Sequence, residues 1–454
     1  MECRECDGLL VAYVKGELAE ADAAIVEGHL KTCGSCRWNE EAARNTLAEV
    51  YDADAAPVCA FARTIIHRAV QERASDVHIE PDSEPKPATH DLGDPSLDAE
   101  ASSSVRIRLR IDGVLHDAWR LPGYMGAPLA TRFMVMSEMN PFERRVPQFG
   151  RIHIRHGDSD HDLRVGTMPG TLGMRVVLRI LSKSSVLIDL PRIGLSDVNL
   201  ARVREASAQP CGVLLVTGPA GGGRTTFLYS LLADLAKPGI SIMTIEDPVE
   251  VRLPGATQTH VNRAAGFDYA EALKAMVRQD PDILLCGEVP GPTVADLVAQ
   301  VALAGHLVLG TVAGDDAVDG LKRYLDLVTD PVTASKALIG VVGLRLVRRV
   351  CRDCVREVEP SDADLAFLRG AGIEHMPPKL RRGAGCEACR GTGYKGRTGI
   401  QEVLLLDQGV RKAIRSGQPV QLEPLVRPSL QQDAAEKAAA GTTTVEEAAR
   451  VTSQ

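Results

Sequence analysis

Residues 212–235 read GVLLVTGPAGGGRTTFLYSLLADL and contain three local patterns in a fixed order. An apolar run typical of a buried strand comes first, a glycine-rich turn follows, and a leucine-rich stretch at helical spacing completes the segment. The turn, Gly218 to Thr226, fits the phosphate-loop pattern G-x-x-x-x-G-K-[ST] at every position except the lysine. The segment therefore predicts a nucleotide-binding α/β domain.

The turn contains the residue types that phosphate binding requires. Glycines let backbone N–H groups point inward, the following helix contributes a favourable dipole, and the hydroxyl of Thr225 can ligate Mg²⁺. Arg224 stands at the lysine position, and its planar guanidinium is not equivalent to a compact ammonium. We therefore expect nucleotide binding to survive where hydrolysis is impaired. The predicted phosphate-binding residues are Gly218, Pro219, Ala220, Gly221, Gly222, Gly223, Arg224, Thr225 and Thr226.

Three further apolar runs, SIMTI, DILLC and HLVLGTV, alternate with helical stretches downstream, which predicts a mainly parallel sheet. Two of these runs lead into acidic residues. The run from Asp282 to Glu288 places carboxylates at a strand, beside the expected Mg²⁺ and attacking water. Glu288 is therefore the candidate general base or water-positioning residue, and Asp282 is a candidate for nucleotide binding. The stretch TIEDPVE at 244–250 gathers three more carboxylates at a strand end.

The segment upstream of the nucleotide domain has a different character. Residues 55–190 combine a helical pattern, VCAFARTIIHRAVQERA, with alternating runs such as VRIRLRIDGVLHDAW and RIHIRHG, which predict antiparallel strands and an α+β domain. Within it, residues at about 81–104 are rich in Pro, Ser and Asp and almost lack large apolar side chains. We predict a disordered loop there.

Eight of the 11 cysteines form four C-x-x-C pairs. In a reducing compartment this pattern indicates metal binding rather than disulfides. Two of the pairs supply four thiolates from two knuckles, which suits a closed structural zinc site. Its predicted ligands are Cys351, Cys354, Cys386 and Cys389. The domain over 191–454 thus includes a zinc element at 351–389, and a helical tail follows Leu404.

Bulk properties exclude several classes of protein. The 454 residues require more than one core, and 44% hydrophobic content fills ordinary cores. No apolar run approaches the roughly 20 residues that cross a bilayer, so a cytoplasmic location is expected. A formal net charge of -8 gives no general attraction to phosphate backbones, and no direct nucleic-acid partner is expected.

The phosphate loop, TIEDPVE, RQDPDILLCGE, AGHLVL and the paired cysteines, in this order, resemble the ATPases of type II secretion and type IV pilus assembly. Upstream, ASDVHIEP, LRIDGVL, ERRVPQFGR and DLRVGTMPG are similar to that family's preceding domain. The resemblance covers about 57–452. It implies a RecA-like core, ATP and Mg²⁺ as cofactors, a homo-hexamer with nucleotide shared between neighbours, and association with platform proteins at the inner membrane.

The resemblance also implies roles for individual residues. Glu246 and Glu250 correspond to an acidic box, Glu288 to Walker B and His306 to a histidine box that senses the γ-phosphate. Arginines of the preceding domain reach the nucleotide in the family, although each alone is an ordinary surface or ion-pair residue. The matching arginines are Arg145, Arg151, Arg164 and Arg179.

This sequence departs from the family pattern where catalysis would occur. Arg224 replaces the lysine, G-E-I-R-D becomes GEVPG at 287–291, and T-L-H-T-N-D becomes TVAGDD at 311–316. Two functions therefore stay open. One is an ATP-hydrolysing motor for secretion or pilus assembly; the alternative is an impaired nucleotide-binding scaffold or regulator of such a machine. A helicase on the same core fits the acidic balance poorly.

Residues 1–47 resemble the zinc-containing modules of anti-sigma factors through H-x-x-x-C-x-x-C and its flanking positions. A segment of this size needs a metal to fold alone, so a helical zinc module is predicted, with an unknown partner. The ligands implied are Cys3, His29, Cys33 and Cys36. Cys6 could replace Cys3 or His29. Alternatively, His29 is a helix-surface residue beside a redox-active cysteine pair.

Overall fold

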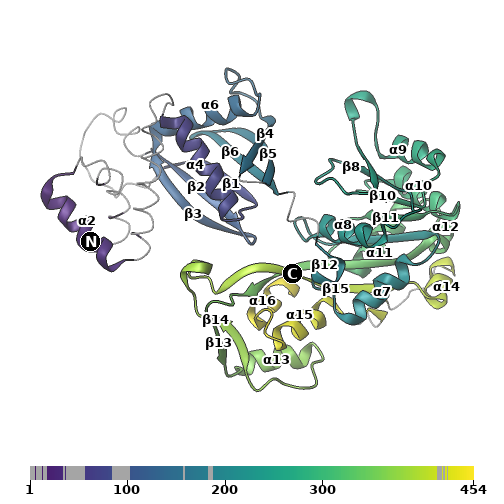
Figure 1. Cartoon of the computed structure of the whole chain (residues 1–454). Helices are drawn as coiled ribbons and strands as arrows, with labels where there is room; N and C mark the ends of the chain where they lie inside the picture. Colours follow the sequence, from purple (N-terminus) through teal and green to yellow (C-terminus); the bar gives the residue numbers. More distant parts are fainter. Residues whose placement is uncertain are drawn as a thin grey trace. The chain divides into compact units, whose positions relative to one another are not determined.

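The structure, a computed structural model, describes Cys6, Tyr13, residues 18–33, Cys36, 57–83, 103–156, 159–182, 188–416, Leu422, 425–426 and 428–453. The chain divides into two compact units, Met1–Ser182 and Lys183–Gln454. Figure 1 shows both units, coloured from the N-terminus to the C-terminus. In the part of the chain that is described, no helix has the length and apolar character needed to span a bilayer.

The first unit contains helix α2 (Glu20–Thr32) and a six-stranded antiparallel sheet of order β3-β2-β1-β6-β5-β4. Two helices, α4 (Pro57–Gln71) and α6 (Gly126–Met136), accompany the sheet, and a short 3-10 helix, η1 (Gly123–Met125), precedes α6. The strands are β1 (Asp76–Ser83), β2 (Ser103–Ile111), β3 (Val114–Pro122), β4 (Gln148–His156), β5 (Ser159–Gly170) and β6 (Gly173–Ser182). This confirms the predicted α+β architecture.

The predicted loop at about 81–104 is too long at both ends. Strand β1 continues to Ser83 and β2 begins at Ser103, because these residues pair with each other across the ladder. Residues 84–102 lie outside the described residues. The alternation seen in the sequence places Val77, Ile79, Ile107 and Leu178 on one sheet face, where they pack against α4 and α6. The opposite face carries the charged residues of the same strands.

The second unit is built on a seven-stranded sheet of order β15-β12-β7-β11-β10-β8-β9, in which every neighbouring pair is parallel except β12 and β15. The strands are β7 (Gly212–Thr217), β8 (Ile242–Glu246), β9 (Ala256–His260), β10 (Ile283–Cys286), β11 (Leu307–Thr311), β12 (Leu338–Val350) and β15 (Tyr394–Leu405). The four apolar runs predicted as strands are β7, β8, β10 and β11. The α/β prediction is therefore confirmed.

Helices cover both faces of this sheet, as the fully apolar central strands require. One face packs against α9 (Tyr269–Met276), α10 (Pro292–Leu303), α11 (Ala317–Leu327), α12 (Pro331–Ala337) and α14 (Gln408–Ser416). The other packs against α7 (Asp197–Ser207) and α8 (Arg224–Leu235). Short 3-10 turns complete the connections: η3 (Leu190–Arg192), η4 (Arg263–Ala265) and η5 (Val277–Gln279).

Strands β12 and β15 form a long antiparallel pair that extends beyond the central sheet (Figure 1). The segment between them contains β13 (Val355–Val358), α13 (Asp362–Gly370), β14 (Leu380–Gly383) and η6 (Glu387–Cys389). Helices α15 (Leu430–Ala439) and α16 (Val445–Thr452) form a separate small core with α13 and the ends of these strands. The helical tail predicted after Leu404 is thus packed on the strand pair.

One buried carboxylate holds α16 to β12. Glu447 is 1% exposed and accepts hydrogen bonds from Arg348 and Arg450. Burial alone would raise the pKa of Glu447, but these donors outweigh burial and lower it to about 2. Arg348 also stacks on Tyr394, with 4.1 Å between the guanidinium carbon and the ring centroid. The carboxylate is therefore stabilised in its charged form in the folded chain.

We expect Glu447→Gln to lower the free energy of unfolding of the second unit by about 3 kcal/mol at pH 7. Because folding lowers the pKa from its ordinary 4.5 to about 2, the stabilisation is present above pH 4.5 and is lost as the pH falls towards 2. Thermal unfolding of both proteins between pH 7 and pH 3 tests this. The exposed neighbour Glu446, changed to Gln, is the control; an equal loss in both variants would contradict the role of Glu447.

Candidate nucleotide site and metal clusters

The phosphate loop joins the buried strand β7 to helix α8. Three of its glycines have positive φ: Gly218 at 148°, Gly221 at 73° and Gly223 at 98°. Gly223 is the residue before α8, and the helix begins at Arg224. A left-handed backbone at these positions turns successive N–H groups towards one side, as a phosphate-binding loop requires.

Strand β12 approaches the loop so closely that side chains are excluded. A Cβ atom on Gly218 would lie 2.2 Å from the carbonyl oxygen of Leu344 on β12, and one on Gly222 would lie 2.8 Å from the carbonyl oxygen of Pro219 in the loop itself. These glycines are needed for packing as well as for turning. The loop is consequently held between its own helix and the neighbouring strand.

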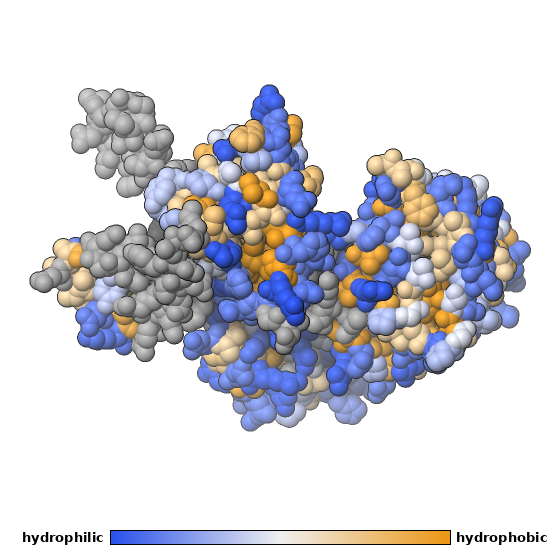
Figure 2. Space-filling model, turned by 45° about the horizontal axis from the view of Figure 1, so that its top comes forward, coloured by the Kyte–Doolittle hydropathy of each residue, from blue (hydrophilic) through white to orange (hydrophobic). Residues whose placement is uncertain are grey.

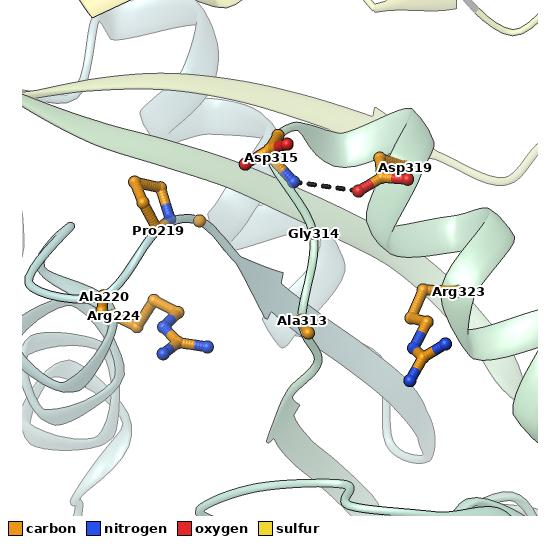
Figure 3. A pocket seen from close by; sticks show the side chains of 9 residues that line it. Pro219, Ala220, Arg224, Ala313, Gly314, Asp315, Asp319 and Arg323 are labelled. Atoms are coloured by element: carbon orange, nitrogen blue, oxygen red, sulfur yellow. Dashed lines mark hydrogen bonds between the residues drawn. The ribbon is translucent and has the colours of Figure 1, made fainter. Parts of the chain in front are cut away.

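A cavity of about 390 Å³ opens beside the loop (Figure 3). Its other wall is the segment after β11 and the first turns of α11. The lining residues are Gly218, Pro219, Ala220, Arg224, Ala313, Gly314, Asp315, Asp319 and Arg323. Arg224 points into this space from the start of α8. The cavity therefore lies where the carboxyl ends of adjacent parallel strands β7 and β11 meet, the usual ligand position in such sheets.

The acidic box consists of two carboxylates in different environments. Glu246, at the end of β8, is 5% exposed and accepts hydrogen bonds from Tyr229, Thr244 and Gln258. Burial, followed by the charge of Glu246, raises the pKa of Tyr229 well above its ordinary value, so the phenol remains a donor. Glu246 is therefore held inside the protein by neutral donors.

Glu250 lies at the loop itself. The hydroxyl of Thr225 donates to its Oε1 over 3.4 Å, which brings two oxygen ligands together at the first turn of α8. Glu288 follows β10 and has an exposed side chain at the same edge of the sheet. Its segment is anchored by Thr311, whose hydroxyl donates to the carbonyl of Gly287 over 2.6 Å. Hard oxygen donors of this kind fit Mg²⁺.

Asp282 and His306 do not join this group, and their predicted roles need correction. Both precede their strands, β10 and β11, and the carbonyl of His306 accepts from Gly212 at the beginning of β7. The ring of His306 bonds the carbonyl of Pro281 over 2.7 Å, and Asp282 accepts from the backbone of Ser241. In a parallel sheet these positions form the edge opposite the phosphate loop.

The four arginines expected in the nucleotide site belong to the first unit. Arg151, Arg164 and Arg179 oppose one another across β4, β5 and β6, so they share the sheet face away from α4 and α6. Arg179 pairs with Asp76 over 2.9 Å. Arg145 is 87% exposed and pairs with Glu143 over 2.6 Å. Their function at a nucleotide stays a prediction.

The four cysteines of the second unit converge as predicted. The Sγ atoms of Cys351 and Cys386 are 3.9 Å apart, those of Cys354 and Cys389 are 3.7 Å apart, and those of Cys386 and Cys389 are 3.6 Å apart. Four thiolates around a tetrahedral zinc ion lie about 3.8 Å from one another, given Zn–S bonds of about 2.3 Å. The geometry fits zinc at the end of β12.

The N-terminal cluster differs from the predicted ligand set. Cys6, His29 and Cys36 offer ligand atoms that all lie within 4.8 Å of one another. The Nε2 atom of His29 is buried without a hydrogen-bond partner, which fits a metal ligand better than a surface histidine. Cys33 packs beside the cluster but is not one of the three, and Cys3 lies outside the described residues. The structure thus favours Cys6, which the sequence left as an alternative.

Several functional candidates were missed by the sequence analysis. Asp319 and Arg323 line the cavity from α11, and their spacing of four residues places them on one helix face. That spacing was the available signal. Tyr229 and Gln258, which hold Glu246, could be identified only from the packing.

Comparison with known proteins gives consistent results for both parts of the chain. The family model described as "Type II/IV secretion system protein" matches residues 51–450, and the model described as "Putative zinc-finger" matches residues 3–37. The chain is 37% identical over 404 residues to "Type II secretion system protein E" of Aeromonas hydrophila, covering 88% of this chain and 76% of the relative. It is 38% identical over 393 residues to "Type IV pilus assembly ATPase PilB" of Thermus thermophilus, covering 85% of this chain and 42% of that longer protein.

Two solved structures share the fold. The Legionella pneumophila ATPase DotB aligns with a TM-score of 0.60 at 15% identity, covering 87% of this chain and 95% of DotB. The pilus retraction motor PilT with bound ADP aligns with a TM-score of 0.55 at 20% identity, covering 86% and 96%. At these identities the similarity concerns the fold alone.

We expect two zinc ions per chain, one in each cluster. Cys386→Ser should remove one and leave the N-terminal ion, and Cys6→Ser should do the reverse. Elemental analysis of the purified variants measures this, with Cys211→Ser, an exposed cysteine outside both clusters, as the control. Retention of two ions in Cys6→Ser would show that Cys6 is not a ligand.

Proposed function

Because this chain belongs to the type II/IV secretion system protein family, we propose that it is a cytoplasmic P-loop ATPase that powers type II secretion or type IV pilus assembly. The observation that carries the proposal is the cavity beside the phosphate loop, into which Arg224 points from α8. Glycines with positive φ and the start of α8 provide the anion-binding geometry on one side. The strand ends that carry Glu246 and Glu288 supply the carboxylates at the same edge.

In this proposal the residues divide the work of phosphoryl transfer. The loop amides and Arg224 bind the phosphates, while Thr225 and Glu250 hold Mg²⁺, directly or through water. When bound, the metal neutralises charge that develops on the terminal phosphates. Glu288 is exposed at the sheet edge and orients the attacking water or accepts its proton. Glu246 is a positioning residue, since its oxygens already accept from Tyr229, Thr244 and Gln258.

A homo-hexamer would give the arginines of the first unit a role at a neighbour's nucleotide. Arg151, Arg164 and Arg179 lie side by side on one sheet face, where Arg151 and Arg179 are exposed and Arg164 is half-buried. Hydrophobic side chains also reach the surface, as Figure 2 shows in orange, and Phe142 and Phe149 are 93% and 84% exposed. Exposed aromatic residues of this kind are typical of subunit interfaces.

The partners proposed for the assembled ring are the inner-membrane platform proteins of a secretion or pilus machine. The zinc element between β12 and β15 is a closed Cys₄ structure distant in sequence from the catalytic loops, which suits docking rather than chemistry. The N-terminal zinc module would recruit a further protein, and the residues of the module do not indicate which class of protein this is. No direct nucleic-acid partner is proposed.

A second candidate is a nucleotide-binding scaffold that hydrolyses ATP slowly. It is favoured by Arg224 and Ala313, which face the same cavity at the two positions where the family has lysine and histidine. In this chain the terminal phosphate of ATP would therefore meet neither the lysine ammonium at position 224 nor the histidine imidazole at position 313. Binding and hydrolysis would then be separate properties of this chain.

We expect Arg224→Lys to raise ATP turnover by roughly tenfold while changing nucleotide affinity much less, because phosphoryl transfer depends mainly on alignment. Phosphate release and fluorescent-nucleotide titration are measured on the wild type, Arg224→Lys and Arg224→Ala. Glu288→Gln serves as the control, with turnover reduced about 100-fold or more. Fast wild-type turnover that Arg224→Lys slows would identify arginine as an adapted catalytic residue and refute the positioning defect.

We also expect a six-subunit ring that nucleotide strengthens. Light scattering at micromolar protein, with and without ATP and Mg²⁺, measures the mass. The double variant Phe142→Ser/Phe149→Ser should shift the mass towards the monomer, because both side chains are exposed in the isolated chain. An unchanged thermal unfolding curve confirms that this variant folds. A monomeric wild type under all conditions would rule out the shared site.

A further inference from the structure

Two guanidinium groups face the cavity beside the phosphate loop from different elements. Arg224 is the first residue of α8, and Arg323 lies in the second turn of α11. Figure 3 shows the two groups on either side of Ala313. Both cations therefore border one space of about 390 Å³, although they are 99 residues apart in the sequence.

Neither guanidinium has a partner within the described part of the chain, whereas many other arginines form ion pairs. Asp319 lies one turn before Arg323, the spacing at which a helical ion pair forms readily. Its carboxylate instead accepts from the backbone N–H of Asp315 over 3.0 Å (Figure 3). The two positive charges thus remain available at the cavity.

Ala313 leaves the space between the two cations open. The next residue, Gly314, cannot fill it, because a Cβ there would lie 2.7 Å from Oγ1 of Thr217 and 2.8 Å from the backbone nitrogen of Gly320. Between Arg224 and Arg323, the segment after β11 therefore contributes only the methyl group of Ala313 to the cavity wall. A longer side chain at position 313 would occupy the gap between Arg224 and Arg323.

We propose that Arg224 and Arg323 form a clamp for the terminal phosphate of a nucleoside triphosphate, with Ala313 providing the room. The inference rests on the proposed nucleotide-binding function and assigns the residues that read the third phosphate. Guanidinium groups bind phosphate oxygens through paired hydrogen bonds, and two of them on opposite sides match a group carrying oxygens on several sides. The loop amides hold the two inner phosphates, which a nucleoside diphosphate and a nucleoside triphosphate have in common.

The clamp predicts discrimination between triphosphate and diphosphate. Without a ligand the two cations repel each other, and an anion between them offsets that repulsion with two attractions. A nucleoside diphosphate lacks the terminal phosphate, so it places no negative charge between Arg224 and Arg323. Arg323 then contributes little to diphosphate affinity but much to triphosphate affinity. If Arg323 only stabilised α11, replacing it would leave the ratio of triphosphate affinity to diphosphate affinity unchanged.

The test compares binding of a non-hydrolysable ATP analogue and of ADP to the full-length chain, by fluorescent-nucleotide competition in Mg²⁺. Arg323→Gln should weaken the analogue by roughly tenfold and leave ADP within about twofold. Ala313→Leu should do the same by filling the gap. Lys322→Gln, on the exposed neighbour of Arg323, and Ala208→Leu, at an exposed site after α7, are the matched controls and should leave both affinities unchanged.

The outcomes separate the clamp from the proposed function. Wild-type binding of both nucleotides with an unchanged affinity ratio in Arg323→Gln would overturn the clamp and leave the nucleotide site intact. Binding of neither nucleotide by the wild type would overturn the proposed function and the clamp with it. Equal weakening of both ligands by Arg323→Gln would assign Arg323 to the inner phosphates and also refute the clamp.

Discussion

The close approach of strand β12 to the phosphate loop is the constraint on which the rest of the second unit depends. The carbonyl of Leu344 leaves no room for a side chain at Gly218, so the loop can turn only with glycine there. Strand β12 also pairs in parallel with β7, the strand that leads into the loop, and a Cβ on Gly223 at the other end of the turn would lie 3.3 Å from Cδ2 of Leu346 on β12. A single backbone contact thus couples the nucleotide site to the strand that ends at the zinc cluster.

Two buried charged residues extend this coupling to the C-terminal helices. Arg345 on β12 donates to the carbonyl of Asp315 over 3.2 Å and to that of Val451 at the end of α16. Glu402 on β15 accepts from Ala317 over 2.7 Å and from Leu430 over 2.9 Å, the first residues of α11 and α15. Burial raises the pKa of Glu402, and the hydrogen bonds from those two N–H groups oppose that rise. Buried hydrogen bonds therefore join strands β12 and β15 to the cavity wall and to helices α15 and α16.

The carboxylates of Glu246 and Asp319 at the nucleotide site have partners other than Arg224. Glu246 is enclosed by neutral donors, so it does not neutralise Arg224, and Asp319 is occupied by the backbone of Asp315. The guanidinium of Arg224 consequently faces a cavity whose opposite cation, Arg323, is also unpaired among the described residues. This arrangement links the two departures from the family pattern, at positions 224 and 313, because the small side chain of Ala313 leaves space beside the larger cation.

Local sequence patterns determined the fold class, the phosphate loop, the four central strands and the four cysteines of the second zinc cluster. These features depend on hydrophobic periodicity, glycine conformation and short ligand spacing, all of which act over a few residues. Residues were misassigned where a motif was read without strand direction: His306 and Asp282 precede their strands, and only the carboxyl ends of parallel strands meet at the loop. The tertiary structure alone decided that Arg323 faces Arg224, that Arg345 reaches the cavity wall and that Cys6 joins His29. Such pairings form between elements far apart in the chain, and no local pattern specifies which side chains the packing of those elements will bring together.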